Sequence, residues 1–242
     1  MRPVLVNSVP KCGTHLLLNI LRMFTPVEQV HRTFVGDWNI GEQAQNLAAG
    51  PSKLFAGHVN LNTETLLAVR PCRHFVVVRD PYDYAIAQAR FFMAEDMGSD
   101  LGAFTRAHDL SFAETLSLVI FGARGPAYWP SLHEIFTTNA VAWLANDVFL
   151  VRYEDLLARV EDLEAPASEI YLTELLTAAG LGALPSDWKR RVLAGAQRRH
   201  SATDRSNLRF TRPTRFPARL SQEQAALVDY ASPGLRRLLG YA

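Results

Sequence analysis

The chain has 242 residues, of which 48% are hydrophobic, so it is long enough to bury a substantial core in one α/β domain. Its formal net charge of +1 argues against a general polyanion binder, and Cys12 and Cys72 are too far apart for a disulfide framework or a structural zinc site. No apolar run has the length of a signal peptide or a membrane span, so we expect a soluble, cytoplasmic protein.

The apolar pattern predicts strands that alternate with helices. Strands are predicted at four short apolar runs, which are 4–6, 54–56, 75–78 and 148–151. Helices are predicted at 16–24, 63–69, 81–92, 167–179, 187–197 and 222–230, and over most of 101–146 with a turn at 122–130. Residues 26–52 lack clear periodicity and are expected to be irregular.

This order of elements predicts an α/β fold. We expect a single domain over residues 1–242, with a P-loop-like central parallel β-sheet flanked by helices on both faces. In such a fold, ligands bind at the carboxyl ends of the strands. The polar motifs described below all follow predicted strands, so they are expected at that edge.

The loop from Ser8 to Thr14 connects the first predicted strand to the first helix. Backbone N–H groups and the positive end of a helix dipole favour a phosphate at such a place. Gly13 allows a close approach of the backbone, Lys11 adds a charge, and donor side chains are offered by Cys12, Thr14 and His15. Because the lysine precedes the glycine, the Walker A pattern is absent, which disfavours an ATPase or a kinase. An ordinary turn between a strand and a helix explains the loop, taken alone, equally well.

The residues Pro10-Lys11-Cys12-Gly13-Thr14-His15 resemble the 5′-phosphosulfate loop of sulfotransferases that use 3′-phosphoadenylyl sulfate (PAPS), usually written PKSGTTW. The resemblance implies that this loop binds the 5′-phosphosulfate and that Lys11 stabilises charge on the bridging oxygen. Cys12 replaces the usual serine, His15 a threonine, and Leu16 the tryptophan that commonly stacks on adenine.

Residues 79–91 resemble the 3′-phosphate segment of the same family, RNPKDVAVSYYHF, with Arg79, Pro81, Asp83 and Phe91 in register. The resemblance implies that Arg79 pairs with the 3′-phosphate of the nucleotide. The serine expected to assist there is Ala87 in this chain, so Gln88 or a downstream arginine is a candidate to replace it. A surface or capping pair between Arg79 and Asp83 is the alternative.

Residues 53–58 resemble the strand of the family that ends in the catalytic histidine, and His58 lies 21 residues before Arg79. Sulfuryl transfer needs a base for the acceptor proton and positive charge near the leaving oxygen, roles that suit His58 and Lys11. Five histidines have no comparable sequence context and are expected to be structural, which are His31, His74, His108, His133 and His200.

Residues 151–157 resemble the Tyr-Glu-Asp element of the family, whose tyrosine lies beside the adenine, which implies that role for Tyr153. Glu154 and Asp155 can equally cap the following helix. Further on, residues 209–221 can be aligned with the RKGxxGDW element near the end of the family's sequences, with Arg209 at the arginine position and Phe216 at the tryptophan position. This alignment suggests a mobile arginine loop that completes the 3′-phosphate pocket.

The motifs together predict a PAPS-dependent sulfotransferase that acts by in-line displacement on a hydroxyl or amine of a small-molecule, lipid or glycan acceptor, with PAP (adenosine 3′,5′-bisphosphate) as product. We expect no metal and no nucleic-acid partner. The alternatives are a P-loop-type kinase and a non-catalytic PAPS- or RNA-binding protein. Aromatic residues that suggest an apolar acceptor pocket are Phe34, Trp38, Phe91, Phe92, Tyr128 and Trp129. The acceptor stays open, as does the choice between monomer and homodimer.

Overall fold

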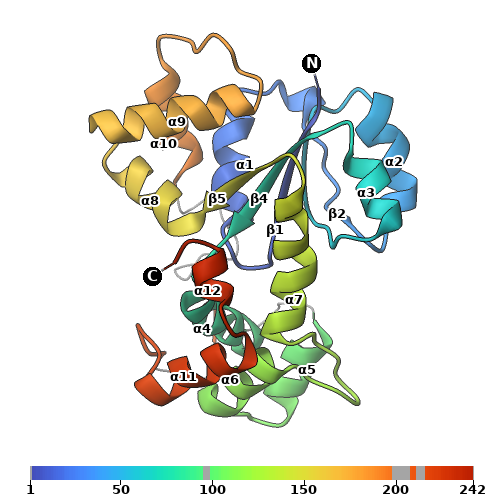
Figure 1. Ribbon diagram of the computed structural model, residues 1–242, viewed down its shortest axis with the longest axis vertical. Helices are drawn as coiled ribbons and strands as arrows, with labels where there is room; N and C mark the ends of the chain where they lie inside the picture. The colour runs from blue at the N-terminus through green and yellow to red at the C-terminus, as the bar shows by residue number, and fades with distance from the viewer. Residues whose placement is uncertain (1, 95–98, 198–207, 211–215, 242) are drawn as a thin grey trace. The chain divides into compact units, whose positions relative to one another are not determined.

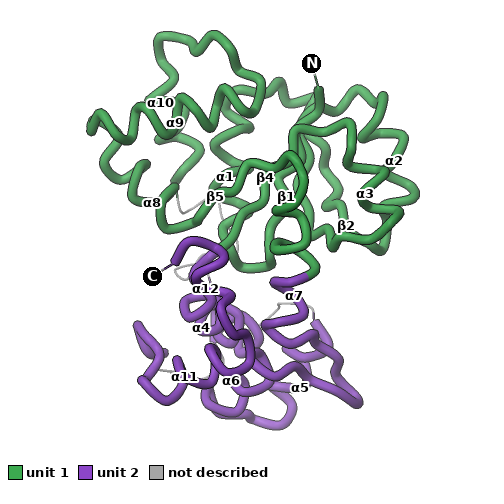
Figure 2. Tube along the Cα trace, in the orientation of Figure 1, with its two compact units in different colours: residues 1–78, 138–201 green, residues 79–137, 202–242 purple. Residues whose placement is uncertain are grey.

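The computed structural model describes residues 2–94, 99–197, 208–210 and 216–241 (Figure 1). The chain folds into two compact units, which Figure 2 shows in different colours. We call residues 1–78 and 138–201 the sheet unit, and residues 79–137 and 202–242 the helical unit. Each unit is described by itself below.

The sheet unit contains a parallel five-stranded sheet with the strand order β2-β3-β1-β4-β5. Its strands are β1 (Val4–Ser8), β2 (Val35–Gly36), β3 (Leu54–His58), β4 (Arg73–Val78) and β5 (Val148–Arg152). In register, Ser8 lies opposite Val77, and Gly36 lies opposite His58. The carboxyl ends of β1, β3 and β4 therefore meet at one edge of the sheet, as the α/β prediction requires.

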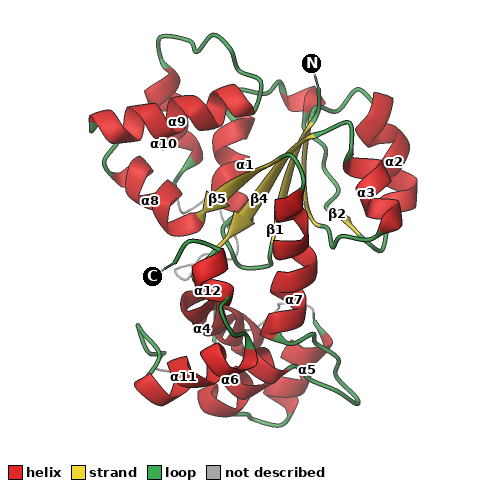
Figure 3. Cartoon of the chain, in the orientation of Figure 1, coloured by secondary structure: helices red, strands yellow, loops and turns green. Residues whose placement is uncertain are grey.

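Helices flank this sheet on both faces (Figures 1 and 3). One side carries α1 (Thr14–Arg22), α8 (Tyr153–Glu161), α9 (Pro166–Ala178) and α10 (Trp188–Gly195). The other side carries α2 (Ile40–Ala49) and α3 (Thr63–Val69). Two short 3-10 helices, η1 (Val27–Gln29) and η2 (Val141–Ala145), lie in the connections.

The core of the sheet unit follows from the alternation of side chains along the strands. Alternate residues of the strands, such as Val4 and Val6 in β1 and Phe75 and Val77 in β4, belong to one buried cluster with α1, α8, α9 and α10. The residues between them, such as Leu5 and Val76, are also fully buried. Burial on both faces explains why these strands are nearly continuous apolar runs.

The helical unit consists of α4 (Pro81–Met93), α5 (Asp100–Ala107), α6 (Phe112–Phe121), most of α7 (Leu132–Asn139), α11 (Gln222–Ala231) and α12 (Leu235–Leu238). Asp80 caps α4 by accepting a hydrogen bond from the N–H of Tyr82, 2.9 Å away. Arg236 of α12 donates to both carboxylate oxygens of Asp80, at 3.1 and 2.9 Å, and lies over the ring of Tyr82. A distant segment of the chain therefore holds the start of α4.

All four predicted strands are confirmed, and the helix at 63–69 has the predicted bounds. The prediction that residues 26–52 are irregular is wrong, because they contain β2 and the ten-residue helix α2. Residues 101–146 hold three α-helices, since a break at 108–111 separates α5 from α6. Among the described residues, no helix combines the length and the apolar character needed to cross a bilayer.

Candidate functional site

The loop between β1 and α1 has the backbone geometry of an anion site. Lys11 has a φ of 63° and Gly13 a φ of 101°, so two left-handed residues flank Cys12. Such turns direct neighbouring N–H groups toward one side, where they can bind an anion. Gly13 is the N-cap of α1, and its carbonyl accepts from the N–H of Leu16 at 3.0 Å. The N–H groups of this helix before Leu16 have no carbonyl one turn earlier in the helix, so they are available to an anion. The left-handed φ of Lys11 costs about 1 kcal/mol, a strain that is typical of functional loops.

The ring of Tyr153 lies directly against Gly13. A β-carbon at position 13 would overlap Cδ2 of this ring and would lie 3.1 Å from its Cε2. Tyr153 is the first residue of α8, directly after β5, so the fold brings it to the loop from the far edge of the sheet. The sheet unit thus places the ring of Tyr153 beside the loop, a contact that the sequence motifs did not predict.

Gly13→Ala is expected to weaken binding of PAP by at least about tenfold, because the left-handed φ costs an alanine about 1–2 kcal/mol and its methyl group also displaces the Tyr153 ring. Titration calorimetry with PAP measures the loss. The matched control is Gly125→Ala, since Gly125 also has a positive φ but a β-carbon there meets no atom within 4 Å. Equal PAP affinity for Gly13→Ala and the wild type would contradict an anion site at this loop.

His58 is the last residue of β3, and its ring is held by the end of β1. Its Nδ1 lies 2.7 Å from the carbonyl oxygen of Ser8. Because a carbonyl only accepts, Nδ1 carries the proton and Nε2 has the free lone pair of the neutral imidazole. The ring of Phe34 lies 5.3 Å from that of His58 between centroids. The arrangement leaves His58 in the tautomer that a general base at Nε2 requires.

Burial lowers the pKa of His58 to about 4. The hydrogen bond to Ser8 opposes this effect, and the charges of His15 and Lys11 add to it. Burial alone lowers the pKa of His74 to about 4 as well, where its ring packs on Trp143 with 4.7 Å between centroids. Both imidazoles are therefore neutral near pH 7.

The stability of the protein is expected to fall as the pH falls from about 6.5 to about 4. In this window the unfolded chain binds protons on His58 and His74, whereas the folded chain does not, so unfolding is favoured by about 2 kcal/mol per histidine at pH 5. Urea unfolding at pH 7.5 and at pH 5 measures the difference. His74→Phe keeps a ring on Trp143 and should remove about 2 kcal/mol of it. A stability that does not change between these two pH values would contradict neutral burial of both rings.

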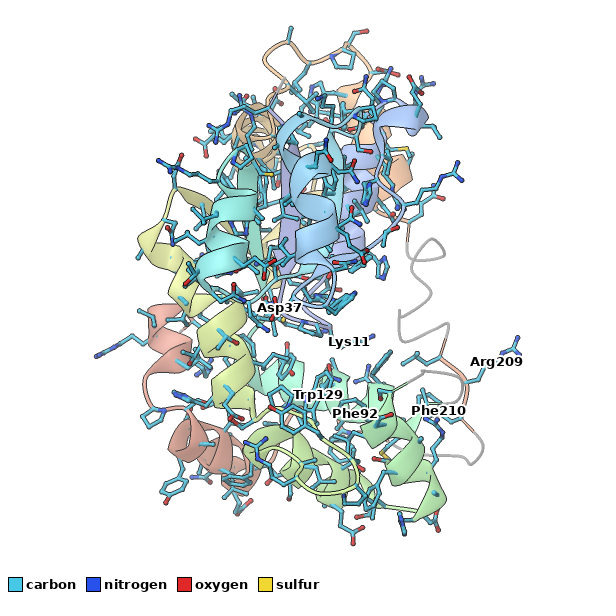
Figure 4. The ribbon with its side chains drawn as sticks, turned by 90° about the vertical axis from the view of Figure 1, so that its right-hand side faces the viewer. Lys11, Asp37, Phe92, Trp129, Arg209 and Phe210 are labelled. Carbon is cyan, nitrogen blue, oxygen red and sulfur yellow. The ribbon has the colours of Figure 1, made fainter. Side chains whose placement is uncertain are left out.

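The remaining predicted residues of the loop have different environments. Cys12 is fully buried, and its N–H donates to the carbonyl of Val9 at 3.1 Å, which closes the turn. Pro10 and His15 are partly exposed. Leu16, at the position of the family's adenine-stacking tryptophan, packs against the hydrophobic core of the sheet unit. Figure 4 shows Lys11 at the end of the sheet unit where the loop between β1 and α1 lies.

Three predicted binding residues belong to the helical unit. Arg79 directly follows Val78, the last residue of β4, and is partly buried. Gln88 lies in α4 and is only 1% exposed, and neither of its amide atoms has a hydrogen-bond partner among the described residues. Buried side-chain amides in folded proteins are usually hydrogen-bonded, so Gln88 is available to a water or a ligand. Arg209 is exposed and points away from the unit in Figure 4.

The aromatic residues suggested for an acceptor pocket are divided between the two units. Phe34 and Trp38 belong to the sheet unit, and the ring of Trp38 lies over Gly36 while 68% of the residue is exposed. In the helical unit, Phe92 and Trp129 pack edge to face, with 4.9 Å between ring centroids (Figure 4). Phe216, aligned with the family's tryptophan, packs against Phe112 and Phe210.

The motif search did not assign a role to two polar residues at the end of β1. Asn7 is fully buried, accepts from the N–H of Val59 at 2.8 Å and donates to the carbonyl of Val59 at 3.1 Å. Ser8 contacts His58, as described above, and its hydroxyl is hydrogen-bonded to that of Thr14. Polar residues at the end of an otherwise apolar strand were the available signal. Among the described residues, no group of three His, Cys, Asp or Glu side chains is placed to hold a metal ion.

The parallel sheet with helices on both faces has a counterpart among solved structures. A solved structure of mouse sulfotransferase SULT7A1 complexed with PAP matches this chain with a TM-score of 0.60, over 100% of this chain and 89% of that one. The two sequences are 16% identical, so the likeness establishes the fold. No family model and no curated protein matches the chain.

Proposed function

We propose that this protein is a sulfotransferase that transfers a sulfuryl group from PAPS to a hydroxyl or amine. One observation carries the proposal. In the sheet unit, the Lys11 loop lies against Tyr153, and the same strand end holds His58 as a neutral base. The shared fold with a sulfotransferase solved in complex with PAP supports the same assignment.

The proposed contacts with the nucleotide are those that the motif resemblance implies. In the proposed complex, N–H groups of the loop bind the 5′-phosphosulfate, and Tyr153 lies beside the adenine. The loop residues that form this cradle are Pro10, Lys11, Cys12, Gly13, Thr14 and His15. Arg79 pairs with the 3′-phosphate, Gln88 supplies the hydrogen bond that Ala87 cannot make, and Arg209 completes the pocket. The buried, unpartnered amide of Gln88 supports its assignment.

The proposed reaction is a single in-line displacement. The acceptor oxygen or nitrogen forms a bond to sulfur while Nε2 of His58 takes its proton. The bond between sulfur and the bridging oxygen breaks, its electron pair goes to that oxygen, and PAP departs. Lys11 and the loop N–H groups stabilise the charge that develops there. The mechanism has no covalent enzyme intermediate and needs no metal.

Binding of PAP by calorimetry, together with transfer of label from sulfur-labelled PAPS to a panel of hydroxyl and amine acceptors, tests the proposal. We expect PAP to bind and at least one acceptor class to be sulfated. Phosphate transfer from ATP with Mg²⁺, without PAP binding, would instead identify a kinase. PAP binding without turnover of any acceptor, unaffected by His58→Ala, would identify a non-catalytic binding protein.

A further inference from the structure

Ser8 contacts both the candidate base and the anion loop. It is the last residue of β1 and is fully buried. Its carbonyl oxygen lies 2.7 Å from Nδ1 of His58, and its hydroxyl oxygen lies 3.3 Å from the same atom. That hydroxyl is also hydrogen-bonded to the hydroxyl of Thr14, the first residue of α1. One side chain therefore links the end of β3 to the loop.

The direction of these hydrogen bonds follows from the chemistry of the atoms. Nδ1 of His58 carries a proton, because the Ser8 carbonyl can only accept. The Ser8 hydroxyl faces this N–H and cannot donate to it, which favours donation of its proton to Thr14 over the reverse direction of that hydrogen bond. The hydroxyl proton of Thr14 is then available to a third acceptor. Since Thr14 opens the helix behind the loop, an anion in the loop is the natural partner.

We propose that Ser8 is a positioning residue that orients both halves of the site through one directed hydrogen-bond chain. Its carbonyl fixes His58 in the tautomer with Nε2 free, and its hydroxyl directs the proton of Thr14 toward the bound phosphosulfate. The part concerning the phosphosulfate rests on the proposed sulfotransferase function. The chain itself, from His58 through Ser8 to Thr14, does not.

This assignment predicts a coupling that a buried serine with a purely structural role would not produce. A change at Thr14 should alter the environment of Nδ1 of His58 only while the Ser8 hydroxyl is present. The groups whose charges act on His58, which are Lys11 and His15, stay the same in every variant, so their influence cancels in the comparison.

A double-mutant cycle with Ser8→Ala and Thr14→Val tests the chain, because Ser8→Ala removes the hydroxyl and keeps the carbonyl. In the unliganded protein, nitrogen NMR of His58 reports on Nδ1. We expect Thr14→Val to shift this resonance in the wild-type background and to leave it unchanged in the Ser8→Ala background. Equal shifts in both backgrounds would overturn the proposal, whether or not the protein binds PAP.

PAP affinity provides the second readout. Each single variant should bind PAP about threefold to tenfold more weakly, the effect of one lost neutral hydrogen bond, and the double variant no more weakly than the weaker single one. Additive losses would contradict a shared chain. If the wild type does not bind PAP, the proposed function fails, and the NMR cycle still decides on the chain.

Two further variants control for folding. Ser8→Thr keeps the hydroxyl and should give the wild-type result in both readouts. If Ser8→Ala is unstable, Ser8→Cys, whose thiol is a weaker hydrogen-bonding group, takes its place as the variant with a weakened chain. Ser168→Ala is the matched control, since Ser168 is also fully buried in the sheet unit and its hydroxyl has no partner among the described residues. It should change neither the His58 resonance nor the PAP affinity.

Discussion

Lys11→Met is expected to lower kcat by about a hundredfold to a thousandfold and to weaken PAP binding about tenfold. In sulfuryl transfer, negative charge develops on the bridging oxygen, and a preorganised cation in the loop stabilises that charge more in the transition state than in the ground state. Methionine keeps an unbranched side chain that is only one atom shorter, and it faces the same left-handed backbone as lysine. Initial rates at saturating PAPS and calorimetry with PAP measure the two effects.

Lys53→Met is the matched control for this variant. Lys53 precedes β3, at the amino end of the strand, where its ammonium group donates to the carbonyl of Gly50 at 3.1 Å. Its removal should change the rate less than about twofold, the scale of a substitution away from the site. If Lys11→Met kept the wild-type rate and PAP affinity, the loop would not be the donor site.

His58→Asn is expected to lower kcat by about a hundredfold to ten-thousandfold while PAP affinity changes by less than about threefold. The asparagine amide can donate to the carbonyl of Ser8 as Nδ1 does, but it has no base at the position of Nε2. Because burial lowers the pKa of His58 to about 4, protonation of this group should not lower the kcat/KM of the wild type until the pH is below about 5. Rates from pH 4 to pH 8 measure this limit.

His133→Asn provides the control, because His133 is exposed on α7 of the helical unit. The exchange should leave both kcat and PAP affinity unchanged. Wild-type turnover by His58→Asn would exclude His58 as the base. An acid limb near pH 6.5 in the wild type would show that its imidazole is not held neutral in the working enzyme.

The strands and the loop could be predicted because their physical causes are local. A strand buried on both faces must be apolar, so the sequence of Phe75 to Val78 alone identifies β4. A glycine after a strand and before a helical pattern likewise indicates a turn that needs left-handed backbone, as found at Gly13. The base candidate His58 was found differently, from the resemblance of residues 53–58 to a family motif and from its place 21 residues before Arg79.

The missed features depend on contacts between distant segments. Helix α2 has little apolar periodicity, since only two of its three buried residues, Ile40 and Leu47, are apolar and the third is Gln43. Strand β2 is too short to give a pattern. The link from Ser8 to His58 requires β1 and β3 to be neighbours, and the contact of Tyr153 with Gly13 requires the ends of β1 and β5 to meet across β4. Strand order is a property of the assembled sheet, which no single segment encodes.

The ion pair between Arg236 and Asp80 has a consequence for how the protein is made. Asp80 caps α4, and its partner lies 156 residues further along the chain. At the usual speed of a ribosome, about 5–20 residues per second, Arg236 is synthesised about ten to thirty seconds after Asp80. During that time the carboxylate stands beside Arg79 without this partner. The start of α4, which lies next to Arg79 of the proposed nucleotide site, therefore gains its ion pair with Arg236 only late in synthesis.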